Sequence, residues 1–273
     1  MAISALIPVR PRWTAKLIIA FAAALALMIN MSPARAAGPN VINKSVINRA
    51  VINTAVIRKA VIGKEVIGHS VQGRPITAWH LGNPHAKKTV VLISQMHGDE
   101  HAVRNILTSL RDGAPVTGID LWLVPRYNPD GVAHDTRQNA HGVDLNRNYP
   151  RSWRHTTGYF DSGPKPSSEP ETRAMMAFLK RVNPDYVISF HQPLHGVDLL
   201  TKHKSFSRKV ATALHLPTKA LSCNGGCHGT MTMWLNHHFA GEAITVEFGA
   251  HPSRNYLRNK EVTSVLAIFN AHR

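Results

Sequence analysis

The stretch KTVVLISQMHGDEHAVRNILTSLRDG, Lys88 to Gly113, decides the fold. Its first part, Lys88–Met96, is a nearly continuous apolar run, which is typical of a strand that is buried on both faces of a sheet. From Glu100 onward the apolar residues recur at helical spacing until Gly113, a residue type that commonly ends helices. A buried strand followed at once by a helix predicts an α/β domain.

The rest of the chain repeats this alternation. The sequence predicts further strands at residues 119–127, 185–190 and 242–248, and helices at residues 167–184 and 259–272. At the start of the first of these helices, Ser168 and Glu171 are placed as a capping box, with Pro170 in the first turn. We therefore expect one α/β domain over residues 67–273.

Residues 1–36 have the composition of a secretory signal peptide. Three basic residues precede the apolar run Leu17–Ile29, and Ala34–Ala36 offers small residues for cleavage. The run has 13 residues, whereas a membrane span needs about 20. We expect cleavage near Ala36 and a secreted, periplasmic or cell-wall location without a stable membrane anchor. A retained anchor is the alternative.

Between the leader and the domain, residues 37–66 contain a repeat in which Val-Ile recurs every five residues from Val41 to Val66. A period of five fits neither a helical face nor the alternation of a strand. So few units do not bury a core of their own. We interpret this segment as a linker or as an added edge strand of the domain.

The chain is strongly basic, with 32 Lys and Arg against 16 Asp and Glu and a net charge of +16. Removal of the leader takes away four basic residues and no acidic ones, which leaves +12. Such a charge favours polyanions. For an exported protein we expect an anionic cell-wall surface as the partner, and no nucleic acid. The alternative is a solvated basic surface that keeps the protein soluble.

Polar residues gather at the ends of the predicted strands. His97, His191 and Glu247 lie at or just past strand ends, as do Arg126–Asn128. Because active-site residues of α/β sheets collect at the carboxyl ends of the strands, these side chains predict a site there.

A metal site is the first candidate. His97 is the only one of the 17 histidines that is followed by a glutamate three residues later, Glu100. A zinc peptidase needs a third protein ligand and an open position, and His191 is the natural candidate. An ordinary polar turn is the alternative for the first pair. The HGVD patterns at His141–Asp144 and His195–Asp198 are weaker rivals, which we expect in glycine-containing loops.

The remaining catalytic groups also have candidates. Glu247 is a charge inside an apolar strand, which is costly without a partner or a task. We expect it to act as general base toward water and then as acid toward the leaving amine; a structural ion pair with an arginine is the alternative. In the long loop Arg126–Pro150, Arg137 is placed to stabilise an oxyanion. Asn146 and Arg147 are placed to grip a substrate carboxylate.

The motifs HGDE, NPDG, RQNAHGVDLNRNYP, SFH and TVEFG, in this order, resemble those of the M14 family of zinc metallocarboxypeptidases. The similarity is greatest to the compact bacterial branch that includes murein peptide amidase, and it covers about Ile67 to the C-terminus. The resemblance implies a single α/β domain with a twisted, mixed and mostly parallel sheet of about eight strands and helices on both faces.

The resemblance also assigns roles to single positions. It implies one Zn²⁺ ion with the ligands His97, Glu100 and His191, a partner of the first histidine at Asp144, an oxyanion-stabilising group at Arg137, a carboxylate-binding pair at Asn146 and Arg147, and a general base at Glu247. Thr232 falls where the family sets side-chain preference, and a small polar residue suits a polar side chain such as that of diaminopimelate.

Two features depart from the family or stay open. The mobile tyrosine of the digestive members has no counterpart near Gly225. Cys223 and Cys227 are close enough to form a disulfide outside the cytosol, although their spacing alone does not fix the geometry.

These observations predict an exported zinc peptidase that hydrolyses the amide before a C-terminal residue with a free carboxylate. A peptidoglycan peptide is the expected substrate, with the γ-D-glutamyl–diaminopimelate bond favoured. A carboxypeptidase acting on protein peptides, and an acylase of the aspartoacylase or succinylglutamate desuccinylase type, are the alternatives. A catalytically inactive wall-binding protein is a further alternative, but the sequence lacks none of the predicted ligands and retains the base.

Overall fold

The computed structural model describes residues 60–221 and 227–273. These residues belong to one compact unit, Ile57–Arg273. The predicted signal peptide, most of the Val-Ile repeat and Cys223 lie outside the described residues, so the interpretations given to them, including the disulfide, stay predictions.

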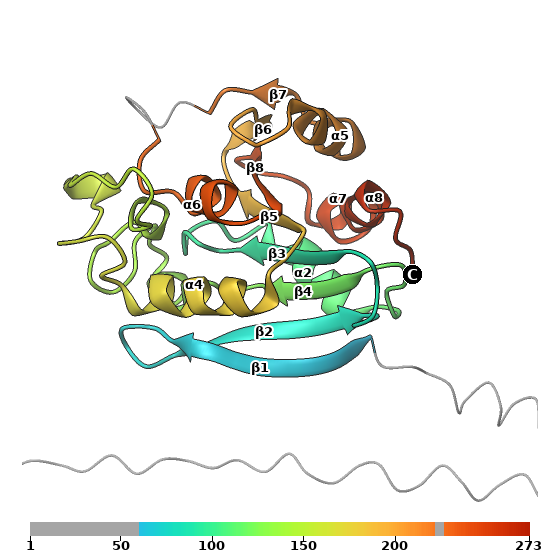
Figure 1. The fold of residues 1–273 in the computed structure, drawn as a ribbon, viewed down its shortest axis with the longest axis horizontal. Coiled ribbons are helices and arrows are strands. Elements are labelled where there is room, and N and C mark those ends of the chain that lie inside the picture. The colour runs from blue at the N-terminus through green and yellow to red at the C-terminus, as the bar shows by residue number, and fades with distance from the viewer. Residues whose placement is uncertain (1–59, 222–226) are drawn as a thin grey trace, which may run out of the picture. The chain divides into compact units, whose positions relative to one another are not determined.

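The described strands form one sheet. They are β1 (Val61–His69), β2 (Pro75–Gly82), β3 (Thr89–Ser94), β4 (Asp120–Val124), β5 (Tyr186–His191), β6 (Leu194–Asp198), β7 (Thr218–Lys219) and β8 (Glu242–Gly249). Their order in the sheet is β1-β2-β4-β3-β5-β8-β6-β7 (Figure 1). The mixed sheet of about eight strands is confirmed.

Seven α-helices and two short 3₁₀ helices complete the described part of the chain. They are α2 (Arg104–Asp112), α3 (Pro129–His134), α4 (Pro170–Val182), α5 (Lys204–Leu214), α6 (Met231–His238), α7 (Arg254–Arg258), α8 (Lys260–Ile268), η1 (Leu145–Arg147) and η2 (Gly158–Phe160). None of the described helices has the length and apolar character of a membrane span.

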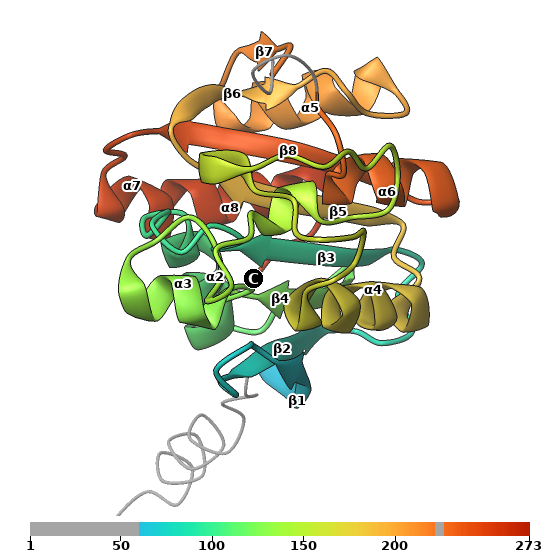
Figure 2. The same ribbon diagram turned by 90° about the vertical axis from the view of Figure 1, so that its left-hand side faces the viewer.

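Helices cover both faces of the sheet (Figures 1 and 2). The alternation along β3 shows how the two cores are divided. Val90 and Leu92 belong to the core under α2, α5, α7 and α8, whereas Val91 and Ile93 belong to the core under α4 and α6. All four side chains are fully buried, so the predicted run Lys88–Met96 contains a strand that is buried on both faces.

The centre of the sheet determines where a site can form. The strands β4, β3, β5 and β8 run parallel, and the flanking strands β2 and β6 pair with them antiparallel. From β3 the chain passes to β4 on one side and later enters β5 on the other side. At such a change of direction a crevice opens at the carboxyl ends of the two strands.

The structure corrects two predicted helix starts. The helix after β3 begins at Arg104 and not at Glu100, whose backbone N–H instead donates to the carbonyl of His97 in a turn. The N-cap of α4 is Glu169 and makes no side-chain cap, so the capping box of Ser168 and Glu171 is wrong. The Ser168 hydroxyl donates to the Glu169 carboxylate at 2.7 Å instead.

The sheet also begins earlier than the predicted domain start at residue 67. Strand β1 runs from Val61 to His69 and pairs antiparallel with β2 at the edge of the sheet. The end of the Val-Ile repeat is thus part of an edge strand, one of the two states expected for it.

Candidate active site

The fold brings His97 and His191 together. His97 follows β3 and His191 is the last residue of β5, and these strands are parallel neighbours whose register pairs Ser94 with Phe190. Both histidines therefore lie at the same edge of the sheet, where the crevice opens.

The three predicted ligands converge there. The Nδ1 atom of His97 lies 2.7 Å from Oε1 of Glu100, and Nδ1 of His191 lies 2.9 Å from Oε2 of the same carboxylate. The two Nδ1 atoms are 3.2 Å apart. All three side chains are buried. Two imidazoles and one carboxylate that point at one another form a donor set that suits zinc.

The Nε2 atoms of both histidines contact other side chains, which supports a metal site on the Nδ1 side. Nε2 of His97 faces Oδ1 of Asp144 at 3.2 Å, and Nε2 of His191 faces the hydroxyl of Ser189 at 2.8 Å. A histidine that donates from Nε2 keeps the lone pair of Nδ1 for a metal. In addition, Oε2 of Glu100 is buried and has no well-aligned hydrogen-bond donor, although His191 is close. This donor set fits a divalent cation.

The charges of this cluster depend on one another. Burial opposes the protonation of His97, but the carboxylates of Glu100 and Asp144 outweigh it and raise the pKa of His97 to about 9. Burial would raise the pKa of Glu100, but His97 and His191 lower it to about 2. The carboxylate thus stays ionised, and protons compete with a metal for the imidazoles.

Gly98 explains how the loop after β3 reaches its position. A Cβ atom at this residue would lie 1.9 Å from the carbonyl carbon of Gly131, in α3. The Gly98 N–H donates to the carbonyl of Thr136 at 2.9 Å. Only glycine allows the loop backbone to come this close to α3. This contact fixes the positions of His97 and Glu100, which lie before and after Gly98 in the loop.

Asp144 joins His97 to Arg137. While Oδ1 faces His97, Oδ2 accepts hydrogen bonds from Nε and Nη2 of Arg137 at 3.0 and 2.8 Å. A third guanidinium nitrogen, Nη1, lies 3.3 Å from Nδ1 of His97. Burial alone would raise the pKa of Asp144, but His97 and Arg137 hold it well below its usual range. Arg137 is thus held beside the predicted metal ligands, with its Nη1 atom facing His97.

Asn146 and Arg147 lie in η1, directly after Asp144. Oδ1 of Asn146 accepts a hydrogen bond from the backbone N–H of Met231, the first residue of α6, at 3.1 Å. Nη1 of Arg147 donates to the carbonyl of Asn146 at 2.8 Å, and its guanidinium lies over the ring of Phe160 at 5.2 Å. Within the described residues Arg147 forms no ion pair, which leaves its charge for a ligand.

Glu247 lies opposite His191 in the register of β5 and β8. Its carboxylate is buried, and Oε2 accepts the backbone N–H of Leu194 at 3.3 Å. Burial raises the pKa of Glu247, and the neighbouring carboxylate of Glu100 adds to the rise while His191 opposes it. A buried carboxylate whose proton affinity is raised is suited to accept a proton. No ion pair with an arginine holds it in the described part of the chain.

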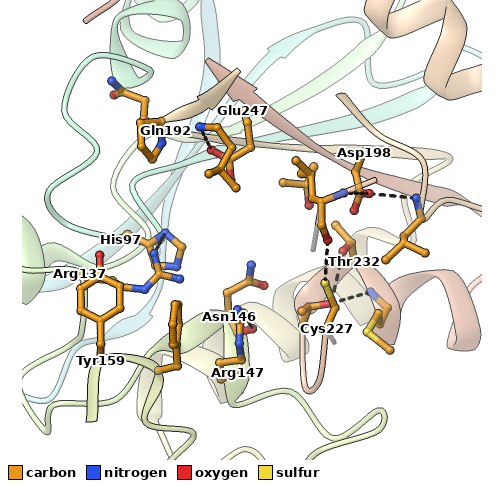
Figure 3. Close-up of a pocket in the computed structure, with 18 residues that line it drawn as sticks. His97, Arg137, Asn146, Arg147, Tyr159, Gln192, Asp198, Cys227, Thr232 and Glu247 are labelled. Carbon is orange, nitrogen blue, oxygen red and sulfur yellow. Dashed lines mark hydrogen bonds between the residues drawn. The ribbon is translucent and has the colours of Figure 1, made fainter. Parts of the chain in front are cut away.

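These groups line one pocket of about 240 Å³. His97, Arg137, Asn146, Arg147, Thr232 and Glu247 all contribute side chains to it (Figure 3). Glu100, His191 and Asp144 do not line the pocket themselves, but each contacts His97, which does. The structure therefore brings together all nine predicted site residues, but their roles remain predictions.

Sequence reasoning missed some of the lining. Tyr159 is 59% exposed and lies 5.1 Å from the guanidinium of Arg137, and no periodic pattern marks it. Asp198 ends β6, so the whole of the second HGVD pattern lies in a strand and not in the predicted loop. No sequence signal marks Asp198, because β6 is antiparallel to β8 and its carboxyl end does not lie with those of the parallel strands.

The chain resembles known proteins over this region. A family model described as zinc carboxypeptidase matches residues 58–193. Murein peptide amidase A of Escherichia coli (strain K12) is 31% identical over 200 residues, which cover 64% of this chain and 77% of that protein. Murein peptide amidase A of Vibrio campbellii (strain ATCC BAA-1116) is 30% identical over 141 residues, which cover 46% of this chain and 56% of that protein.

Solved structures agree with these matches. The crystal structure of a murein-tripeptide amidase from Escherichia coli O157 has a TM-score of 0.66 at 29% identity, over 77% of this chain and 93% of that chain. Carboxypeptidase A from Helicoverpa armigera has a TM-score of 0.66 at 15% identity, over 83% of this chain and 72% of that chain. The second likeness shows the fold alone.

Proposed function

The chain belongs to the zinc carboxypeptidase family and is a hydrolase, and on this premise we propose that it is an exported zinc peptidase acting on peptidoglycan peptides. It hydrolyses the amide before a C-terminal residue that carries a free carboxylate, with the γ-D-glutamyl–diaminopimelate bond as the favoured target. The observation that carries the proposal is the convergence of His97, Glu100 and His191 beside Glu247 in one pocket.

His97, Glu100 and His191 would hold the zinc ion. When bound there, zinc supplies Lewis-acid polarisation of the scissile carbonyl and a lowered pKa for water. Glu247 takes the proton from the attacking water and delivers it to the leaving amine. Its raised pKa matches both roles, because the carboxyl has to bind a proton and then release it.

Two arginines, Arg137 and Arg147, stabilise negative charges of the substrate. Arg137, oriented by two hydrogen bonds to Asp144, stabilises the oxyanion that develops as the carbonyl is attacked. Arg147 and Asn146 bind the terminal carboxylate of the substrate. Charge-assisted contacts of this kind are stronger than neutral hydrogen bonds, so they select a chain end over an internal peptide bond.

Three considerations support a cell-wall substrate. The relatives from Escherichia coli and Vibrio campbellii are murein peptide amidases. The leader composition favours export, and the basic mature chain favours an anionic surface. A general carboxypeptidase and an N-acyl amino acid hydrolase are the competing outcomes of the following experiment.

The direct test is mass spectrometry of L-Ala-γ-D-Glu-diaminopimelate incubated with zinc-loaded and with chelated protein. We expect release of free diaminopimelate by the loaded protein and none after chelation. Cleavage of an ordinary peptide or of an N-acyl amino acid, with the tripeptide left intact, would instead support one of the two competing functions.

Replacing Arg147 by alanine tests the recognition of the chain end. We expect the KM for a substrate with a free carboxylate to rise by about 100-fold with a smaller effect on kcat, because the lost interaction binds the unreacting terminus. Steady-state kinetics on the tripeptide and on its C-terminal amide measure this. An unchanged KM would indicate an endopeptidase.

A further inference from the structure

The two arginines of the pocket contact the same aromatic ring. The guanidinium carbons of Arg137 and Arg147 each lie 5.2 Å from the centre of the Phe160 ring. The preceding residue, Tyr159, contacts Arg137 in the same way at 5.1 Å. All four side chains line the pocket, and Figure 3 shows Tyr159 on the same side of it as the two arginines. The chemistry described so far gives the two rings no task.

Arg147 is a buried cation without an acidic partner. It is 7% exposed, and no carboxylate of residues 60–221 or 227–273 forms an ion pair with it. Its Nη1 atom donates to the carbonyl of Asn146 at 2.8 Å. Burial lowers the pKa of Arg147; Asp144 opposes this effect and the charge of Arg137 adds to it. A buried charge is costly unless another group compensates it.

An aromatic face compensates a cation without using up its hydrogen-bond donors. The face of the ring is electronegative and attracts a guanidinium, while the N–H groups at the edge of the guanidinium stay free for a substrate carboxylate. Arg137 shows the contrast, because its Nε and Nη2 atoms both donate to Asp144. A carboxylate in place of Phe160 would occupy donors of Arg147 in the same way.

Phe160 is held by the loop that carries the arginines. It ends η2, and two carbonyl groups of η2 accept hydrogen bonds from Nε2 of Gln138 at 3.1 Å. Directly after η2, the carbonyl of Asp161 accepts the backbone N–H of Asp144 at 2.7 Å. Gln138 follows Arg137 in the chain, so short, hydrogen-bonded segments connect the ring to the guanidinium groups.

We propose that Phe160 is a positioning residue whose ring holds the guanidinium groups of Arg137 and Arg147 at fixed places in the pocket. This inference rests on the proposed peptidase function, in which the first meets the oxyanion and the second the terminal carboxylate. The two like charges repel each other, and the shared ring offsets part of this repulsion. A fixed separation suits a substrate in which one residue separates the scissile bond from the chain end.

The test replaces each ring by leucine, which keeps an apolar side chain, and uses the zinc-loaded protein with L-Ala-γ-D-Glu-diaminopimelate. In Phe160→Leu the KM rises about 10-fold. The kcat falls only about threefold, because Arg137 keeps its bonds to Asp144. In Tyr159→Leu the kcat falls about threefold and the KM is unchanged, since within the described residues this ring contacts Arg137 and not Arg147. Phe160→Tyr restores both constants.

A double variant separates positioning from direct contact with the substrate. If the ring acts through Arg147, adding Phe160→Leu to Arg147→Gln does not raise the KM further. Additive increases in KM would show that the ring contacts the substrate itself, and would overturn the inference. The matched control is Phe239→Leu, which removes another partly buried ring. That ring packs on Trp234 at 5.2 Å and does not line the pocket, so both constants stay unchanged.

Nuclear magnetic resonance of the zinc-free protein gives a readout that needs no activity. The Nε–Hε signal of Arg147 is identified by its loss in Arg147→Gln. We expect it to be separate from the signals of exposed arginines in the unmodified protein and in Phe160→Tyr, and to merge with them in Phe160→Leu. An unchanged signal in Phe160→Leu refutes the inference. If the unmodified protein leaves the tripeptide intact, the proposed function fails, and this spectrum alone decides the role of Phe160.

Discussion

At the scale of single residues, Asp144 contacts two residues with different predicted roles. Its two oxygens face the imidazole of His97 and the guanidinium of Arg137. The same carboxylate thus orients a predicted zinc ligand and a predicted oxyanion-binding group. Such partners of metal ligands commonly affect metal affinity by about 10- to 100-fold. We therefore expect metal binding and catalysis to be coupled through this side chain.

Replacing Glu247 by glutamine removes the proton acceptor and keeps the shape of the side chain. We expect zinc to remain bound, because Glu247 is not one of the three ligands, and kcat to fall by about 1000-fold. In the unmodified protein, burial raises the pKa of Glu247. Activity is thus retained above this pKa and is lost as the pH falls through it, at a pH above the ordinary glutamate value. Metal analysis and pH–rate profiles measure both effects, and undiminished turnover would remove Glu247 from its role.

Single residues were predictable where one chemical group has one evident task. His97 and His191 were predicted as metal ligands because they lie at or just past strand ends, and Glu100 because it follows His97 by three residues. Asp198 lines the same pocket but was not recognised, because it ends a strand that the sequence predicts to be a loop and that runs antiparallel to the central strands.

At the scale of elements, the loop between β3 and α2 holds two of the three predicted ligands, His97 and Glu100. It lies against α3 because residue 98 has no side chain. The replacement Gly98→Ala forces the loop away from Gly131, since its new Cβ would overlap the backbone. We expect a loss of stability of about 2 kcal/mol and a zinc affinity lowered roughly 10-fold, as measured by denaturation and by competition with a chelating dye.

The control for this variant is Gly73→Ala, in the turn between β1 and β2. Gly73 has a φ of +76° with nothing within 4 Å of the added Cβ. Its replacement lowers the free energy of unfolding by about 1 kcal/mol, because alanine is disfavoured at a positive φ. Zinc affinity stays unchanged. Equal zinc affinities in the unmodified protein, Gly98→Ala and Gly73→Ala would show that Gly98 does not position the predicted ligands.

Elements were predictable when they are long and periodic. The strands β3, β4, β5 and β8 and the helices α4 and α8 follow apolar runs or helical spacing. The strand β6 was expected to be a loop because its HGVD pattern contains Gly196. With only two residues, β7 is too short for any pattern. The capping box failed because the Ser168 hydroxyl finds a nearer partner in Glu169.

At the scale of the whole molecule, the positive charge is partly concentrated in one groove. Arg74, Arg104, Arg111, Arg126 and Arg258 line it. Arg74 and Arg111 pair with acidic residues, whereas burial and the neighbouring arginines lower the pKa of Arg104. A groove of mutually repelling cations favours an anionic polymer, such as the expected cell-wall surface.

We predict that the protein binds isolated cell walls in a salt-dependent manner through this groove. A basic group near an anionic surface typically contributes about 1 kcal/mol. The double variant Arg104→Gln/Arg126→Gln therefore weakens sedimentation with cell walls roughly 10-fold or more. Arg208→Gln/Lys209→Gln, which removes the same charge from α5, is the control. Equal weakening by both variants would indicate a dispersed basic surface.

The overall architecture was predictable because its central strands are buried on both faces and alternate with helices. The composition of the crevice follows from the order of strands, which single-strand patterns do not contain. Strand-end positions and the resemblance to a family both predicted which residues meet there, and the adjacency of β3, β5 and β8 brings His97, His191 and Glu247 together.

The most direct test of the whole account is anomalous diffraction at the zinc absorption edge from crystals of the zinc-loaded protein. We predict one peak, bound by Nδ1 of His97, Nδ1 of His191 and the carboxylate of Glu100, with Glu247 beside it but not among its ligands. A zinc peak bound elsewhere, or none at these three side chains, would contradict the account.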